Sequence, residues 1–99
     1  MRKDRISTDH VKKIEGEKTG SAFILSQKDG ENSIILNGGA NMHTPDTVDA
    51  TWYQTIAKAN ILLLQREIPA EINSELVSNI HDRKTVVILD MGGQDRPLA

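Results

Sequence analysis

The sequence contains no cysteine and only one Trp, one Tyr and one Phe. Without cysteine the chain has no disulfide, no thiolate metal ligand and no cysteine nucleophile. The composition therefore gives no indication of secretion into an oxidising compartment. A membrane span needs about 18 or more apolar residues in a row, whereas the longest apolar runs here, such as Ile61–Leu64 and Val86–Leu89, are four residues long. We therefore expect a cytoplasmic chain without membrane contact, and an organelle address in a longer parent stays open.

An excess of charge of either sign is also missing. Lys and Arg number 12 and Asp and Glu number 14, which leaves a formal net charge of −2. This balance gives no electrostatic argument for nucleic acid or an anionic lipid surface as a partner. The length of 99 residues fits one small domain, and the charged share of 26% with an apolar share of 37% excludes wholesale disorder.

Two short β-favouring runs flank the pair Asp29-Gly30. An Asp-Gly pair is typical of a hairpin turn, because glycine relieves the strain of a positive φ. We predict strands over about residues 21–27 and 32–37. The glycines of Gly38-Gly39-Ala40-Asn41 follow, without the Lys-Ser or Lys-Thr of a Walker loop or the third glycine of a dinucleotide fingerprint. We interpret them as a structural turn and not as a phosphate cradle.

The second half of the chain predicts the order helix, strand, helix, strand. Thr44-Pro45-Asp46 offers a cap, a helix-starting proline and a first-turn acid, so we expect a helix from there to about Lys58. The unalternated stretches over residues 61–64 and 85–89, apolar apart from Thr85, are typical of parallel strands covered on both faces. With a second helix opening at Pro69 between them, they form a βαβ unit of an α/β fold.

Ligands of such sheets bind beyond the carboxyl ends of the strands, which directs attention to residues 65–67 and 90–95. Glu67 suits two roles equally well, a first-turn helix acid or an acceptor for sugar hydroxyls. For Asp90 and the glycines after it, we favour a plain loop over an anion site, because no helix N-terminus follows them. The three histidines are too far apart in the sequence to predict a metal site.

The order and spacing of several short motifs carry a family resemblance. The motifs are Thr19-Gly20-Ser21-Ala22, Asp29-Gly30-Glu31-Asn32, Gly39-Ala40-Asn41 and Leu62-Leu63-Leu64-Gln65-Arg66-Glu67-Ile68-Pro69. They resemble the middle of the PfkB-type carbohydrate kinases, in the ribokinase branch of that family, over about residues 5–98. The ending Leu89-Asp90-Met91-Gly92-Gly93 resembles eukaryotic, plant-like members more than the bacterial members, which have Asn-Pro-Ala at this point.

The resemblance implies transfer of a phosphoryl group from ATP to the 5-hydroxyl of D-ribose, with magnesium and a monovalent cation such as potassium. It also implies a β-sheet lid that closes over the sugar and pairs two subunits. By this analogy Glu67 binds ribose, while Ala22 and Ile34 line the apolar wall of the lid. No catalytic residue and no metal ligand is carried over.

Family members are much longer, and their anion hole, catalytic base and metal motif have no counterpart in this sequence. We therefore expect a single partial domain over residues 1–99, with lid strands in about 1–40 and the α-β-α-β part in about 41–99. We expect the isolated chain to be inactive and to bind neither ATP nor the metals. The alternatives are a non-catalytic module that pairs through the lid strands, and a poorly folded remnant whose parallel strands lack covering helices.

Overall fold

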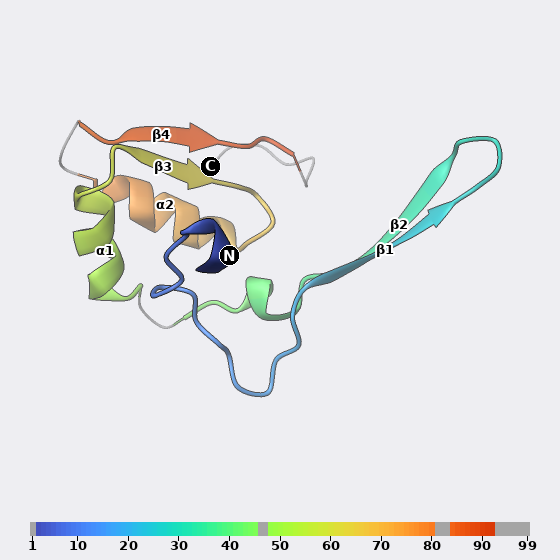
Figure 1. Cartoon of the computed structure of the whole chain (residues 1–99), viewed down its shortest axis with the longest axis horizontal. Helices are drawn as coiled ribbons and strands as arrows, with labels where there is room; N and C mark the ends of the chain where they lie inside the picture. Colours follow the sequence, from blue (N-terminus) through green and yellow to red (C-terminus); the bar gives the residue numbers. More distant parts are fainter. Residues whose placement is uncertain (1, 46–47, 81–83, 93–99) are drawn as a thin grey trace.

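The computed structural model describes residues 2–45, 48–80 and 84–92. Its elements are, in order, η1 (Arg2–Asp4), β1 (Ser21–Ser26), β2 (Asn32–Asn37), η2 (Gly39–Met42), α1 (Ala50–Ala57), β3 (Ile61–Leu64), α2 (Ala70–Ser78) and β4 (Val86–Leu89). An antiparallel β1-β2 hairpin extends as an arm from a body made of α1, α2 and the parallel β3-β4 sheet (Figure 1). This is the predicted α/β class. None of the helices within the described ranges is long and apolar enough to cross a membrane.

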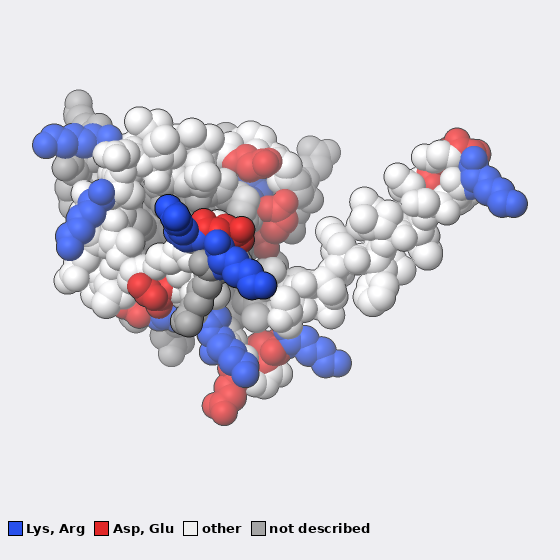
Figure 2. Space-filling model, viewed as in Figure 1, with Lys and Arg blue, Asp and Glu red and all other residues white. Residues whose placement is uncertain are grey.

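The hairpin forms where the Asp-Gly pair predicts it. Gly30 has a φ of 88°, and the N–H of Gln27 donates to the carbonyl of Glu31 at 2.8 Å to close the turn. Every residue of β1 and β2 is exposed. Charged side chains lie at the tip of this arm and over the body, while its shaft carries none (Figure 2). Both predicted strands are confirmed.

The pairing register makes both faces of the arm apolar. Directly opposed residues of an antiparallel pair share a face, and neighbours along a strand alternate between faces. One face therefore carries Ala22, Ile24, Ile34 and Leu36, and the other carries Phe23, Leu25 and Ile35. Both faces meet solvent, as the 65% exposure of Phe23 and the 58% exposure of Ile34 show.

The base of the arm is a close crossing of two backbone segments. The N–H of Ala40 donates to the carbonyl of Lys18 at 2.7 Å. Gly39 has a φ of 52°, and a Cβ on it would collide with that same carbonyl oxygen. The N–H groups of Gly39 and Asn41 are also taken, by the side chain of Asn37 and the carbonyl of Gly38 respectively. The prediction of a structural turn is confirmed, because these amides are not available to a phosphate.

Helix α1 begins later than predicted. Its N-cap is Asp49, whose Oδ1 accepts hydrogen bonds from the backbone N–H of Thr51 at 2.9 Å and from its hydroxyl at 2.7 Å. The predicted start at Thr44-Pro45-Asp46 is wrong, and Asp46 lies outside the described residues. Asp49 offers an equally good cap, and a helix beginning there still turns Trp52 toward the core. The predicted end near Lys58 is confirmed, since Lys58 is the C-cap.

The βαβ unit is confirmed, with β3 and β4 in parallel register from Ile61↔Val86 to Leu64↔Leu89. Both helices lie on one side of this two-stranded sheet (Figure 1). The opposite side is open, and Leu63 there is 72% exposed. The expectation of strands covered on both faces is therefore wrong for the described part of the chain, because α1 and α2 pack into the same small core.

That core consists of a buried cluster with partly buried apolar neighbours. The buried members are Val48, Ile72 and Leu76, and the neighbours are Trp52, Tyr53, Ile56, Leu64 and Ile68. Two polar contacts join the layers around it. The hydroxyl of Tyr53 donates to Oε1 of Glu75 at 2.7 Å and links α1 to α2. The buried hydroxyl of Thr85 donates to the carbonyl of Ala59 at 2.9 Å and fastens the start of β4 to the end of α1.

Candidate functional site

The turn that follows β3 presents Glu67 at the carboxyl edge of the parallel sheet. Helix α2 begins at Ala70 with Pro69 as its N-cap, so Glu67 lies before the helix and Glu71 is the acid of its first turn. The structure thus decides against the helix-acid role for Glu67. Its side chain is exposed and, within the described residues, its carboxylate makes no hydrogen bond or ion pair. Both oxygens can accept hydrogen bonds from a ligand.

The backbone around Glu67 is held from several directions. The side-chain amide of Asn73 on α2 donates to the carbonyl of Gln65 at 2.6 Å, and the backbone N–H of Glu67 donates to Oε1 of Gln65 at 2.5 Å. Arg66, between them, is only 6% exposed. Because its neighbours are anchored or buried, Glu67 extends from a fixed turn and not from a loose loop. The sequence pointed to the acid but not to Asn73 or to the burial of Arg66.

Asp90 stands at the end of the neighbouring strand. Its backbone N–H donates to the carbonyl of Leu64 at 2.9 Å, which places it beside the last residue of β3. Its Oδ1 accepts the N–H of Gly92 at 2.7 Å. This local turn supports the plain-loop interpretation for the first part of residues 90–95, and residues 93–95 lie outside the described part of the chain.

Ala22 and Ile34 lie on the same face of the arm, on opposite strands and diagonal to each other. The carboxyl ends of β3 and β4 point toward the side of the body from which the arm extends (Figure 1). This face of the arm is open to solvent, because Ile34 is 58% exposed. The structure therefore groups Ala22 with Ile34 and leaves both apart from Glu67.

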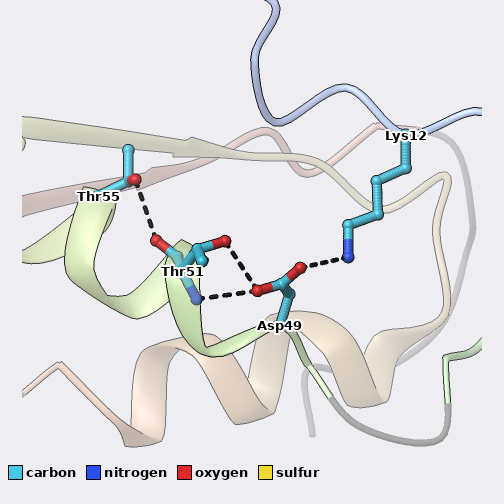
Figure 3. Close-up of polar contacts among 4 residues, drawn as sticks. All are labelled: Lys12, Asp49, Thr51 and Thr55. Carbon is cyan, nitrogen blue, oxygen red and sulfur yellow. Dashed lines mark hydrogen bonds and ion pairs between the residues drawn. The ribbon is translucent and has the colours of Figure 1, made fainter.

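The structure also shows a charged contact that the sequence did not predict. Nζ of Lys12 lies 2.6 Å from Oδ2 of Asp49 and 5.3 Å from the centroid of the Trp52 ring. Figure 3 shows this ion pair next to the cap that Asp49 forms with Thr51. Hydrogen bonds from Lys12 and Thr51 hold the pKa of Asp49 well below its usual range. Because 37 positions separate Lys12 from Asp49, no local pattern could reveal the pair.

The histidines do not gather into a site. Nε2 of His10 lies 2.8 Å from Oγ1 of Thr55 in a hydrogen bond to α1, His43 is exposed, and His81 lies outside the described residues. No group of three His, Asp or Glu side chains close enough to hold a metal ion occurs in the described ranges.

Comparison with known proteins identifies the family to which this chain belongs. A family model described as pfkB family carbohydrate kinase matches residues 1–96, and the chain belongs to this family. Within the family, the chain is 40% identical over 94 residues to a ribokinase of Arabidopsis thaliana, covering 94% of this chain and 25% of that protein. It is 41% identical over 71 residues to a ribokinase of Schizosaccharomyces pombe, covering 72% of this chain and 22% of that protein.

A solved structure agrees with these relatives. The structure of Arabidopsis thaliana ribokinase complexed with ribose and ATP matches with a TM-score of 0.77 and 42% identity, over 85% of this chain and 27% of that one. The predicted resemblance and the partial ribokinase-like fold are confirmed. The chain spans about a quarter of the length of the curated relatives it matches.

Proposed function

We propose that the chain is part of a sugar kinase that, when complete, transfers a phosphoryl group from ATP to the 5-hydroxyl of D-ribose. The observation that carries the proposal is the exposed carboxylate of Glu67, held on a fixed turn at the carboxyl edge of a parallel sheet. Similarity to a ribokinase whose structure contains ribose and ATP supports the choice of substrate and nucleotide.

In this proposal Glu67 accepts hydrogen bonds from ribose hydroxyls. A carboxylate buried beneath a bound sugar discriminates against ligands that lack the matching hydroxyl, because its oxygens would then be left without partners. The arm is the lid, and the face that carries Ala22 and Ile34 forms its apolar wall. Closing such a lid excludes water and strengthens the electrostatic interactions of phosphoryl transfer.

We propose that this chain by itself binds neither ATP, magnesium nor potassium. The amides of the glycine turn at the base of the arm are engaged in backbone and Asn37 contacts. No suitable group of carboxylates and histidines is present among the described residues. Phosphoryl transfer depends on positioning the phosphates and neutralising their charge. We therefore propose that the isolated chain does not catalyse the reaction and that other parts of a complete kinase bind the nucleotide and metals.

The test measures sugar binding and turnover separately on the 99-residue chain. We expect ribose to shift the NMR amide resonances around Glu67, Glu67→Gln to abolish those shifts, and Glu71→Gln, a matched exposed acid on α2, to retain them. A coupled assay for ADP should show no ribose-dependent turnover. Shifts that survive Glu67→Gln would contradict the role of Glu67, and turnover by the isolated chain would contradict its proposed inactivity.

A second candidate function is a non-catalytic module that pairs with another chain through the lid strands. It is favoured by the exposure of every residue in a sheet of only two strands, whose outer edges have no partner among the described residues. Exposed edges invite strand addition, and a homodimer formed in this way is also compatible with the kinase proposal. Sedimentation distinguishes the cases, since a strict monomer that ignores both ribose and an intact ribokinase would exclude the module.

A further inference from the structure

The direction of the arm depends on the segments at its base and not on packing of the arm itself. Every residue of β1 and β2 is exposed, so the arm is not held by burial of its side chains in the body. Its two legs, residues 12–20 before β1 and 38–45 after β2, are joined by the hydrogen bond from Ala40 to Lys18. The absence of a Cβ on Gly39 permits this close crossing, because a Cβ there would collide with the carbonyl oxygen of Lys18. The arm and its two legs therefore move together.

The first leg is attached to the start of α1. The two carboxylate oxygens of Asp49 have different partners. Oδ1 accepts from the backbone N–H of Thr51 and caps the helix, and Oδ2 accepts from Lys12 at 2.6 Å. The ammonium group of Lys12 also lies 5.3 Å from the centroid of the Trp52 ring, within the range of a cation–π contact. Trp52 packs against the buried core cluster, so Lys12 is bound to a rigid part of the body.

A second contact supports the same attachment one turn along the helix. Nε2 of His10 and Oγ1 of Thr55 are 2.8 Å apart, and the same hydroxyl donates to the carbonyl of Thr51 at 3.0 Å. Figure 3 shows the polar contacts that run from Lys12 to the N-cap Asp49, then to Thr51, and from the carbonyl of Thr51 to Thr55 one turn further along α1. Residues 10–12, which precede the arm, therefore lie along α1, with His10 bound to Thr55 and Lys12 bound to the N-cap Asp49.

We propose that Lys12 is a positioning residue that sets the angle of the arm relative to the sheet edge carrying Glu67. The ion pair with Asp49 closes a ring over residues 12–49 that contains the whole arm. Losing it leaves one of the two described contacts between this segment and α1, the His10–Thr55 hydrogen bond, and so widens the range of arm angles. The relevance to a sugar site rests on the proposed function, whereas the positioning itself is a property of this chain and is measured without sugar or nucleotide.

Spin-label distance measurement tests the proposal, and the absence of cysteine makes site-specific labelling straightforward. Labels attached at Lys28→Cys on the tip of the arm and at Ser74→Cys on α2 report the angle between arm and body. We expect one narrow distance distribution for the otherwise native chain and a broader, displaced one after Lys12→Met. Lys13→Met, which changes the adjacent exposed lysine, should leave the distribution unchanged.

Further variants separate positioning from folding. Asp49→Asn keeps a capping oxygen for α1 but loses the charge, so it should reproduce the effect of Lys12→Met, whereas Lys12→Arg should restore the native distribution. In about 1 M salt the screening length falls to about 3 Å, and the native distribution should broaden while that of Lys12→Met stays as it is. Circular dichroism confirms that each variant is folded.

Two outcomes would overturn the proposal. One is a broad distribution in the chain with native Lys12, and the other is a distribution that Lys12→Met and salt leave unchanged. Neither outcome bears on the binding of ribose at Glu67, so failure of the positioning role is distinguishable from failure of the proposed function.

Discussion

Truncating one buried side chain should remove a large part of the stability of this chain. Leu76 is 6% exposed and is one of the three buried members of the core cluster. Leu-to-Ala changes in cores cost about 2–5 kcal/mol. At the usual 0.05–0.15 kcal/mol per residue, a chain of 99 residues has about 5–15 kcal/mol of unfolding free energy, and so small a core favours the low end. At that low end of about 5 kcal/mol, Leu76→Ala should therefore remove between about 40% and all of the unfolding free energy.

The neighbouring residue provides a matched control on the same helix. Val77 is 46% exposed. Fully burying a Val side chain contributes about 1.5–3 kcal/mol, and Val77→Ala removes only part of a half-exposed side chain, so its cost should stay below about 1 kcal/mol. Urea unfolding followed by the fluorescence of Trp52, the single tryptophan, measures both changes, because this ring packs against the core cluster.

The comparison has a definite refuting result. If Leu76→Ala and Val77→Ala differ by less than about 1 kcal/mol in unfolding free energy, Leu76 does not occupy a close-packed core. If the native chain itself shows no cooperative transition, the remnant hypothesis replaces that of a folded partial domain. A cooperative transition lost only in Leu76→Ala supports the structure.

Three further predictions concern polar and backbone contacts. Gly39→Ala should destabilise the base of the arm by about 1 kcal/mol or more, because its φ is positive and a Cβ meets a carbonyl oxygen of the opposite leg; amide exchange in the arm measures the loss. The hydrogen bond to Glu75 raises the pKa of Tyr53, so Glu75→Gln should return that pKa toward 10.0 in an absorbance titration. The Tyr53–Glu75 contact should stabilise the folded chain fully below pH 10.0 and lose this effect as the pH rises through the raised pKa. Asp49 has a lowered pKa, so its stabilising effect should be complete above its ordinary value of 3.8 and disappear only as pH falls through the lowered one; NMR titration should show Lys12→Met raising the midpoint.

The sequence predicts the parts of the fold that depend on neighbouring residues. The hairpin follows from Asp29-Gly30 between two β-favouring runs, and the parallel strands follow from their unalternated apolar runs. The start of α1 could not be predicted in the same way, because Thr44 and Asp49 are both good caps. The burial of the sheet on one side only depends on where both helices pack, which no local pattern contains.

The candidate site shows the same division. Its position directly after a strand was enough to select Glu67 as a candidate ligand-binding residue. Only the start of α2 at Ala70 shows that Glu67 is not an acidic residue of the first helical turn. The family resemblance, and not the hydrophobic pattern, selected Ala22 and Ile34. Lys12 was missed because its partner Asp49 is close only in the folded chain.

The register of the arm has a consequence for how it meets other surfaces. A ribbon that folds down over a site covers only one of its two sides, and the strict alternation along each strand assigns Ala22 and Ile34 to the same side. Phe23 and Ile35 then remain turned outward to water. If the arm closes over a site as proposed, the movement buries only one face, and burying the face that carries Phe23 and Ile35 requires a second surface.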